Sequence, residues 1–225
     1  MIAGNDLAPR KSLGQHWLTD DDALHSIVDM AKVSSDDFVL EIGPGKGALT
    51  KLLTKEAKQV LAIELDAKLA SYLESLNIAN LTVKNEDILN FNLDSLSEYK
   101  LVANIPYYLT GKLIRKISEA KSRPSLAVLL VQKEIADRLS AEPGNLSVLG
   151  LTCQYFWQVE KGIMVTKDKF EPSPKVDSQV IRLTPKKLTL LLAQQSELFR
   201  LFKIGFSSKR KTILNNLAAG LRTDK

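Results

Sequence analysis

The sequence contains few residues of the kinds that bind metals or form disulfides. Its 225 residues include one cysteine, Cys153, and two histidines, His16 and His25. A single cysteine excludes an internal disulfide, and so few thiol and imidazole groups argue against a zinc site. We therefore expect no resident metal.

Long apolar runs are also missing. No stretch approaches the roughly 20 apolar residues of a membrane-spanning helix, and Met1 to Arg10 lacks the apolar centre of a signal peptide. The composition, 44% hydrophobic and 25% charged, is ordinary for a soluble globular protein. These features predict a cytoplasmic protein with one α/β domain and a small appendage, and nothing in the sequence demands more than a monomer.

Acidic residues are scarce near the end of the chain. Residues 161–225 hold 14 Lys and Arg against 5 Asp and Glu, whereas residues 1–160 hold 17 against 21. A basic end on a mildly acidic body suggests a polyanionic partner, nucleic acid above all. A solvated basic surface without a partner is the structural alternative.

The sequence does contain a regular alternation of strand-like and helix-like segments. Buried strands are expected to begin at about Phe38, Gln59, Leu81, Leu101 and Ser125. Helices are expected at about 21–32, 48–56, 66–76 and 110–120, and after residue 131. This spacing predicts an α/β fold, a Rossmann-like parallel sheet with helices on both faces.

The pattern changes after residue 145, where a helix to about residue 155 is expected. The β-rich runs 158–165 and 178–183 are expected to pair as an antiparallel edge, with a proline-stiffened loop between them. From about Lys187 the chain has a helical period and no strand signal. We therefore expect a main domain with an extended N-terminal arm, residues 1–186, and a basic helical C-terminal domain, residues 187–225.

A glycine-rich turn, Glu41-Ile-Gly43-Pro44-Gly45-Lys-Gly, follows the first strand, where an α/β sheet binds nucleotide-like ligands. Gly43 and Gly45, with Glu64 about 20 residues on, fit either a dinucleotide or S-adenosylmethionine. A pyrophosphate needs free N–H groups and positive charge. Here Pro44 removes an N–H and Glu41 adds a carboxylate, which favours the cationic groups of S-adenosylmethionine.

Acidic residues end the next two strands. Glu64 is placed to hold both ribose hydroxyls of that cofactor, and Asp87 to accept a hydrogen bond from its adenine amine. Together with Glu41 they outline one ligand. Capping or surface carboxylates are the structural alternative.

A polar and aromatic cluster, Asn104-Ile105-Pro106-Tyr107, follows the strand that begins at Leu101. Asn104 offers a carboxamide, Pro106 leaves the Ile105 carbonyl free to point outward, and Tyr107 offers a flat face for a base. Together these groups suit a planar amine such as the edge of an adenine. A strand that ends in a proline turn, with Tyr107 packed in the core, is the alternative.

The cluster suits methyl transfer to an adenine N6. Hydrogen bonds from this amine to the Asn104 side-chain oxygen and the Ile105 carbonyl hold the nitrogen in line with a methyl donor, and these acceptors stabilise its developing positive charge. Tyr107 and Phe170 are expected to sandwich the base, with core packing as the alternative for Phe170. A base inside a duplex must first be extruded.

Basic residues near both ends of the chain are assigned to RNA. Lys209, Arg210 and Lys211 are expected to grip phosphates, and Arg10 and Lys11 lie in the basic start of the arm. A soluble helix surface is the alternative for the C-terminal group.

Six motifs occur in a fixed order: Leu13-Gly-Gln-His-Trp-Leu18, Glu41-Ile-Gly-Pro-Gly-Lys-Gly47, Ala62-Ile-Glu-Leu-Asp66, Asn104-Ile-Pro-Tyr107, Phe170-Glu-Pro-Ser-Pro-Lys-Val-Asp-Ser178 and Phe206-Ser-Ser-Lys-Arg-Lys-Thr-Ile-Leu-Asn-Asn-Leu217. This set resembles the ribosomal RNA adenine dimethyltransferases, specifically the KsgA type of the small subunit. The match covers nearly the whole chain.

The resemblance implies a methyltransferase that places two methyl groups on N6 of each of two adjacent adenosines near the 3′ end of small-subunit rRNA. It implies action late in assembly of that subunit, and kasugamycin resistance when the modification is lost. It also implies that the arm around Gln15 closes over the cofactor. The residues that it implies as contacts of S-adenosylmethionine are His16, Leu18, Gly43, Glu64, Asp87 and Asn104.

The sequence departs from the family pattern in three places. His16 stands where many members have asparagine, so its cofactor contact is expected to run through the backbone. Trp17 replaces the usual phenylalanine. The family usually has a longer helical C-terminal domain, so residues 187–225 are expected to be an incomplete one.

Three other functions fit parts of the pattern. One is the antibiotic-resistance relative that methylates one adenosine of large-subunit rRNA, against which the Leu-Gly-Gln arm and the Phe-Ser-Ser-Lys-Arg-Lys segment argue. Another is a non-catalytic RNA-binding assembly or transcription factor on the same fold, against which the intact Asn104–Tyr107 motif argues. The third is a nicotinamide-dependent oxidoreductase.

Overall fold

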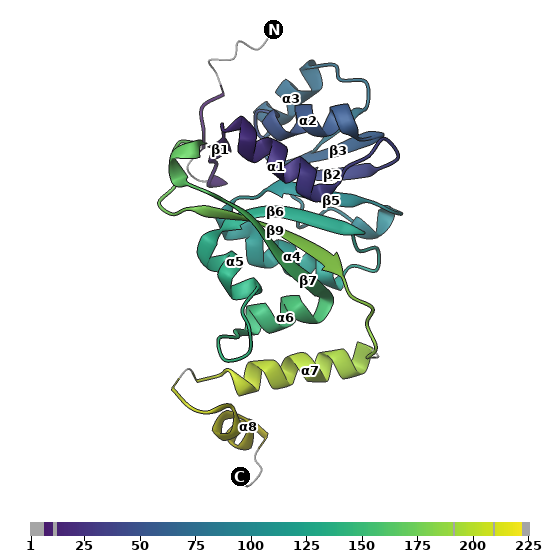
Figure 1. The fold of residues 1–225 in the computed structure, drawn as a ribbon. Coiled ribbons are helices and arrows are strands. Elements are labelled where there is room, and N and C mark those ends of the chain that lie inside the picture. The colour runs from purple at the N-terminus through teal and green to yellow at the C-terminus, as the bar shows by residue number, and fades with distance from the viewer. Residues whose placement is uncertain (1–6, 11–12, 191, 209, 222–225) are drawn as a thin grey trace.

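The computed structural model describes residues 7–10, 13–190, 192–208 and 210–221 (Figure 1). Lys11 and Lys209, both assigned to RNA from the sequence, lie outside these ranges. Within the described ranges, no helix combines the length and the apolar character that crossing a membrane requires.

A seven-stranded sheet with the order β4-β3-β2-β5-β6-β9-β7 forms the centre of the molecule (Figure 1). The strands are β2 (Phe38–Ile42), β3 (Gln59–Glu64), β4 (Leu81–Asn85), β5 (Lys100–Asn104), β6 (Leu126–Gln132), β7 (Trp157–Val165) and β9 (Ser178–Pro185). Strands β2 to β6 pair in parallel, and β9 runs antiparallel to both β6 and β7. The predicted parallel sheet with an antiparallel edge is confirmed.

Helices cover both faces of this sheet (Figure 1). One face carries α1 (Asp21–Ala31), α2 (Ala48–Glu56) and α3 (Ala67–Ser75), and the other carries α4 (Thr110–Glu119), α5 (Lys133–Leu139) and α6 (Val148–Phe156). Asp20 caps α1, because its side chain accepts a hydrogen bond from the Ala23 N–H. The helix expected from residue 145 begins at Val148, where the Ser147 side chain caps it.

Alternation along the strands explains why the protein has a core on each face. In β6, Ala127, Leu129 and Val131 belong to the cluster beneath α4, whereas Val128 and Leu130 belong to the cluster beneath α1. Successive side chains of a strand point to opposite faces, so a strand buried on both sides reads as a continuous apolar run. This is why the strand segments could be recognised in the sequence.

The C-terminal segment is helical, as expected. It forms α7 (Leu192–Gly205) and α8 (Ile213–Leu221), which lie at the end of the molecule away from β1 (Figure 1). The Phe199 ring meets the Tyr155 ring of α6 edge-on, with centroids 5.5 Å apart. Buried Asn216 donates hydrogen bonds to the carbonyls of Gly205, at 2.7 Å, and Ser208, at 3.1 Å, which fixes the turn between the two helices. The domain boundary at residue 187 stays a prediction.

One pairing was not foreseen. The arm contains β1 (Trp17–Leu18), which pairs in antiparallel fashion with β8 (Phe170–Glu171) in a second, two-stranded sheet. The segment from Phe170 was expected to be a loop, and this expectation was wrong for its first two residues. Leu18 lies opposite Phe170, and both are buried in one core cluster. The pairing fixes the arm over the carboxyl ends of the central strands.

Candidate active site

One pocket lies where β2, β3, β4 and β5 reach their carboxyl ends. Its wall includes every residue that the sequence assigned to the cofactor, namely Gln15, His16, Leu18, Gly43, Gly45, Glu64, Asp87 and Asn104. It also includes every residue assigned to catalysis, namely Ile105, Pro106, Tyr107 and Phe170 beside Asn104. Segments far apart in the chain thus contribute to a single cavity at the edge where α/β sheets bind ligands.

The glycine turn and the arm pack against each other. Gly45 has a φ of 58°, in the left-handed region, and a Cβ atom there would lie 2.9 Å from the Trp17 ring. Glycine is therefore required both by the backbone conformation and by the ring above it. The Lys46 ammonium lies 4.0 Å from the centroid of the Trp17 ring, a cation–π contact. Trp17, a departure from the family pattern, thus joins the arm to the turn.

Glu64 at the end of β3 is a buried acceptor held in a fixed orientation. Its Oε2 accepts a hydrogen bond from the Gly45 N–H at 3.0 Å, and its Oε1 accepts one from the Asp66 N–H at 2.9 Å. Burial raises the pKa of Glu64, and the hydrogen bonds from Asp66 and Gly45 counteract that rise. Each carboxylate oxygen retains further capacity to accept hydrogen bonds.

The arm is also tied to the start of α3. The Arg10 guanidinium pairs with the Asp66 carboxylate at 3.0 Å, and the Arg10 N–H donates to Gln15 Oε1 at 2.8 Å. Asp66 caps α3 as well, since it accepts from the Lys68 N–H. Arg10 was assigned to RNA from the sequence, but the structure places its charge against an acid beside the cofactor residues.

Glu41 is buried on the pocket wall, and neither of its carboxyl oxygens has a hydrogen-bond partner among the described residues. Burial raises the pKa of Glu41 to about 8. The nearby Thr50 hydroxyl moderates the rise without reaching hydrogen-bond geometry, and the Glu64 charge adds to it. The sequence suggested a carboxylate here, but desolvation keeps this group largely protonated at pH 7.

The Asn104–Tyr107 segment adopts the expected turn at the end of β5. Pro106 has φ −55° and ψ 134°, and among the described residues no turn or side-chain donor occupies the Ile105 carbonyl. The Asn104 Nδ2 group donates to the His16 carbonyl at 3.3 Å, so its side-chain oxygen is the atom left for a ligand. Two acceptors therefore lie on consecutive residues of the pocket wall.

Aromatic rings surround these acceptors. The rings of Tyr107 and His16 are stacked, with centroids 5.9 Å apart and an angle of 22° between their planes. The Tyr107 hydroxyl lies 2.8 Å from Ser178 Oγ. Phe170 lines the pocket and is also buried in a core cluster. It therefore packs in the core, as the structural alternative expected, and also lies at the site.

Tyr108 is a pocket residue to which the sequence analysis gave no role. It lines the cavity, is 56% exposed, and its ring lies beneath Gly14 of the arm. Burial raises the pKa of its phenol, and the charges of Asp87 and Glu64 raise it further, which places the ring near both acids. Its position next to Tyr107 was the only signal in the sequence, because no periodicity distinguishes two adjacent tyrosines.

The remaining residues assigned to RNA lie elsewhere. Arg210 and Lys211 are exposed between α7 and α8 and do not line the pocket. Figure 1 shows this connection at the opposite end of the molecule from the arm. Arg210 and Lys211 therefore lie apart from the pocket.

Comparison with known proteins matches this architecture to one family. The family model described as ribosomal RNA adenine dimethylase matches residues 7–225. The ribosomal RNA small subunit methyltransferase A of Mycoplasmopsis pulmonis is 43% identical over 211 residues, covering 92% of this chain and 83% of its own. That of Leuconostoc mesenteroides is 40% identical over 223 residues, covering 94% of this chain and 76% of its own.

Solved structures agree. A dimethyladenosine transferase from Plasmodium falciparum superposes with a TM-score of 0.78 at 33% identity, over 92% of this chain and 77% of that one. The 23S rRNA methyltransferase ErmE superposes with a TM-score of 0.77 at 29% identity, over 90% of this chain and 84% of that one. The resemblance seen in the six motifs is thus confirmed, and the chain belongs to the ribosomal RNA adenine dimethylase family of methyltransferases.

Proposed function

We propose that this chain uses S-adenosylmethionine to dimethylate N6 of two adjacent adenosines near the 3′ end of small-subunit rRNA during ribosome assembly. One observation carries the proposal. The acceptors of Asn104 and Ile105 share a pocket with the strand-end acids Glu64 and Asp87. The names of the similar small-subunit methyltransferases support the choice of RNA.

The pocket residues fit the cofactor. Glu64 offers two oriented carboxylate oxygens for a pair of ribose hydroxyls. Asp87 accepts from the Leu89 N–H through Oδ1, which leaves Oδ2 for an adenine amine. The Glu41 carboxyl also lies on this wall without a hydrogen-bond partner among the described residues, and a cationic group bound beside it would favour its ionised, accepting form. When bound, S-adenosylmethionine supplies an electrophilic methyl group.

The target amine is held by Asn104 and Ile105. An adenine N6 is a weak nucleophile because its lone pair is delocalised into the ring. Hydrogen bonds from this amine to the Asn104 Oδ1 and the Ile105 carbonyl favour a pyramidal nitrogen and stabilise the charge that develops on it. No strong base is needed, since a methylated aminium nitrogen loses its proton to water or to a carbonyl.

The base itself is expected to lie against Tyr107 and Phe170. Both rings line the pocket, and the Tyr107 ring is held at its hydroxyl by Ser178. Aromatic rings in a pocket wall offer apolar surface to a base that has left its stack. The proposed substrate is therefore a single-stranded or extruded adenosine.

We assign RNA backbone contacts to the basic helical segment, residues 187–225, as a unit separate from the main domain. Arg210 and Lys211 are exposed there. Arg200, by contrast, pairs with Glu197 at 2.8 Å. Because phosphate contacts release counterions, RNA affinity should fall with salt, and Arg210→Ala should reduce that salt dependence.

Calorimetry separates the cofactor assignment from its rival. S-adenosylhomocysteine is expected to bind the protein, and NAD is not. Binding of NAD alone would support the nicotinamide-dependent oxidoreductase and remove the methyltransferase proposal.

Methyl transfer assays separate the RNA substrates. Transfer to immature small subunits is expected, with dimethyladenosine as the product. Transfer only to naked large-subunit rRNA would favour the alternative of a large-subunit rRNA methyltransferase, the activity in the name of the 23S rRNA methyltransferase ErmE, which has a similar fold. RNA binding without transfer to either substrate would favour a non-catalytic assembly factor.

A further inference from the structure

His16 lies where three segments of the pocket meet. Its ring stacks on Tyr107 after β5, with centroids 5.9 Å apart. Its Nδ1 lies 2.6 Å from the Pro172 carbonyl, directly after β8. Its own carbonyl accepts the hydrogen bond from Asn104 Nδ2 at 3.3 Å. One residue of the arm thus touches both aromatic and amide parts of the site.

These contacts fix the imidazole. The Pro172 carbonyl can only accept, so the ring donates through Nδ1. The ring is then restrained at its edge by Pro172 and at its face by Tyr107. Such double restraint is what holds a side chain within the narrow geometry that catalysis requires.

The same contacts orient the acceptors of the target amine. The Asn104 NH₂ group donates to the His16 carbonyl, so the amide cannot turn this group toward the target without losing that hydrogen bond. The Tyr107 ring has His16 on one side and Ser178 at its hydroxyl. Both groups that the proposed function places against the base therefore depend on where the arm puts His16.

We propose that His16 is a positioning residue for the target adenine, which couples closure of the arm to alignment of Asn104 and Tyr107. This inference rests on the proposed function. It adds a role for the side chain to the expectation taken from the resemblance, in which His16 contacts the cofactor through its backbone. The side chain serves the base, and its removal affects turnover more than cofactor affinity.

Two substitutions separate the contacts of the ring. His16→Asn retains an N–H near the place of Nδ1 and loses the stacked ring, whereas His16→Phe retains the ring and loses the donor. His16→Ala removes both. His25→Ala is the matched control, because His25 is the other histidine of the chain and is exposed on α1.

We expect His16→Ala to lower kcat by about 10-fold or more, since small misplacements of reacting groups have effects of this size. The KM for immature subunits and the Kd for S-adenosylhomocysteine should stay within about 2-fold. Each partial variant should retain more turnover than His16→Ala, and His25→Ala should match the wild type.

The ratio of products, compared at equal total methylation, gives a readout that a loss of folded protein would not change. After the first methylation N6 has one proton left, so one acceptor contact is lost and ring positioning matters more. His16→Ala should therefore accumulate monomethyladenosine, while His25→Ala yields dimethyladenosine as the wild type does.

The ring nitrogens provide a test without turnover. Nitrogen-15 NMR of the two imidazoles should show a protonated Nδ1 at His16, and Tyr107→Ala should shift the His16 signals but leave those of His25 in place. If wild-type turnover is normal and His16→Ala equals His25→Ala, the positioning role is wrong and the proposed function stands. If the wild type methylates neither RNA, the proposed function fails and the positioning role fails with it.

Discussion

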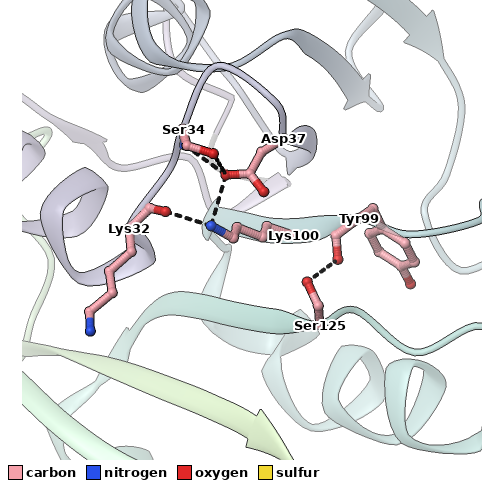
Figure 2. Close-up of polar contacts among 6 residues, drawn as sticks. All are labelled: Lys32, Ser34, Asp37, Tyr99, Lys100 and Ser125. Carbon is pink, nitrogen blue, oxygen red and sulfur yellow. Dashed lines mark hydrogen bonds and ion pairs between the residues drawn. The ribbon is translucent and has the colours of Figure 1, made fainter.

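The polar groups at the two ends of the central strands differ in how fully they are hydrogen-bonded. At the amino ends of β2 and β5, the Lys100 ammonium pairs with the Asp37 carboxylate at 2.8 Å and also donates to the Lys32 carbonyl (Figure 2). The backbone N–H and the hydroxyl of Ser34 both donate to the same Asp37 oxygen. Figure 2 also shows Ser125 hydrogen-bonded to the Tyr99 carbonyl next to Lys100. This end is a network of satisfied partners.

Near the carboxyl ends of the same strands, polar groups are still able to form further hydrogen bonds. Both oxygens of Glu41 and the Trp17 indole N–H are buried without a hydrogen-bond partner within the described part of the chain. An unsatisfied buried polar group costs about 1–3 kcal/mol. Strand β5 contains both situations, since Lys100 begins it and Asn104 ends it. We infer that the edge at the amino ends of the strands stabilises the sheet, whereas the edge at their carboxyl ends keeps polar groups available for ligands.

The acids at the two ends of β2 have opposite pKa shifts. Burial raises the pKa of Asp37, but hydrogen bonds from Lys100 and Ser34 outweigh it and leave the pKa below its usual value. Burial raises the pKa of Glu41 to about 8. Asp37 therefore stabilises the fold at neutral pH, and this contribution is lost as pH falls through its lowered pKa. The contribution of Glu41 is complete at acidic pH and is lost as pH rises toward 8.

The largest expected effect is a loss of methyl transfer with little change in stability. Asn104→Ala removes an acceptor of the target amine, so kcat for methyl transfer should fall by about 10²–10³-fold. The free energy of unfolding should change by less than about 1 kcal/mol, because the side chain is only half-buried. The matched control is Asn145→Ala, on an exposed loop. Unchanged turnover in Asn104→Ala would refute the proposed mechanism.

The next effect concerns the cofactor. Glu64→Gln replaces a carboxylate that accepts from two backbone N–H groups with an amide, whose single oxygen can accept but whose NH₂ group cannot. The Kd for S-adenosylhomocysteine should rise by about 10-fold or more, as measured by calorimetry, since hydrogen bonds to charged groups contribute about 1.5–3 kcal/mol. Glu74→Gln, exposed on α3, is the control. Equal affinity in both variants would place the ribose elsewhere.

The free energy of unfolding, measured without added S-adenosylmethionine, should depend on pH through Glu41. Between the unfolded pKa of 4.5 and the folded pKa of about 8, the folded protein keeps a proton that the unfolded chain has lost. From this group the free energy of unfolding falls by at most about 1.4 kcal/mol per pH unit in that range.

Urea unfolding from pH 5 to pH 8 measures this dependence. Glu41→Gln should show a flatter dependence than the wild type, because its amide does not titrate. Glu56→Gln, at an exposed position of α2, should keep the wild-type slope. A Glu41→Gln curve parallel to the wild-type curve would mean that Glu41 is ionised in the folded protein.

The smallest expected effect is a loss of stability with methyl transfer retained. Lys100→Met removes the partner of Asp37 and should lower the free energy of unfolding by about 1–3 kcal/mol, with methyl transfer retained at a temperature where the variant is folded. The loss should shrink as pH falls through the lowered pKa of Asp37, because the protonated carboxyl no longer pairs with Lys100. Lys112→Met, exposed on α4, should be neutral. Loss of turnover in folded Lys100→Met would show that the two ends are coupled.

The sequence alone determined the layers of the fold and most of the pocket. Continuous apolar runs identified the strands because strands covered on both faces bury every residue. The glycine turn, Glu64, Asp87 and Asn104–Tyr107 were found because each lies at or just after the end of a strand, and parallel strands bring their carboxyl ends to one edge.

Only the tertiary structure decided how the arm completes this pocket. Trp17 pairs with Glu171 and His16 meets Pro172, contacts between residues about 150 positions apart that leave no local pattern. Tertiary structure also decided the state of Glu41, whose identity is evident in the sequence but whose protonation depends on burial. Periodicity and turn chemistry are local properties, whereas pairing across the chain and desolvation exist only once the chain has folded.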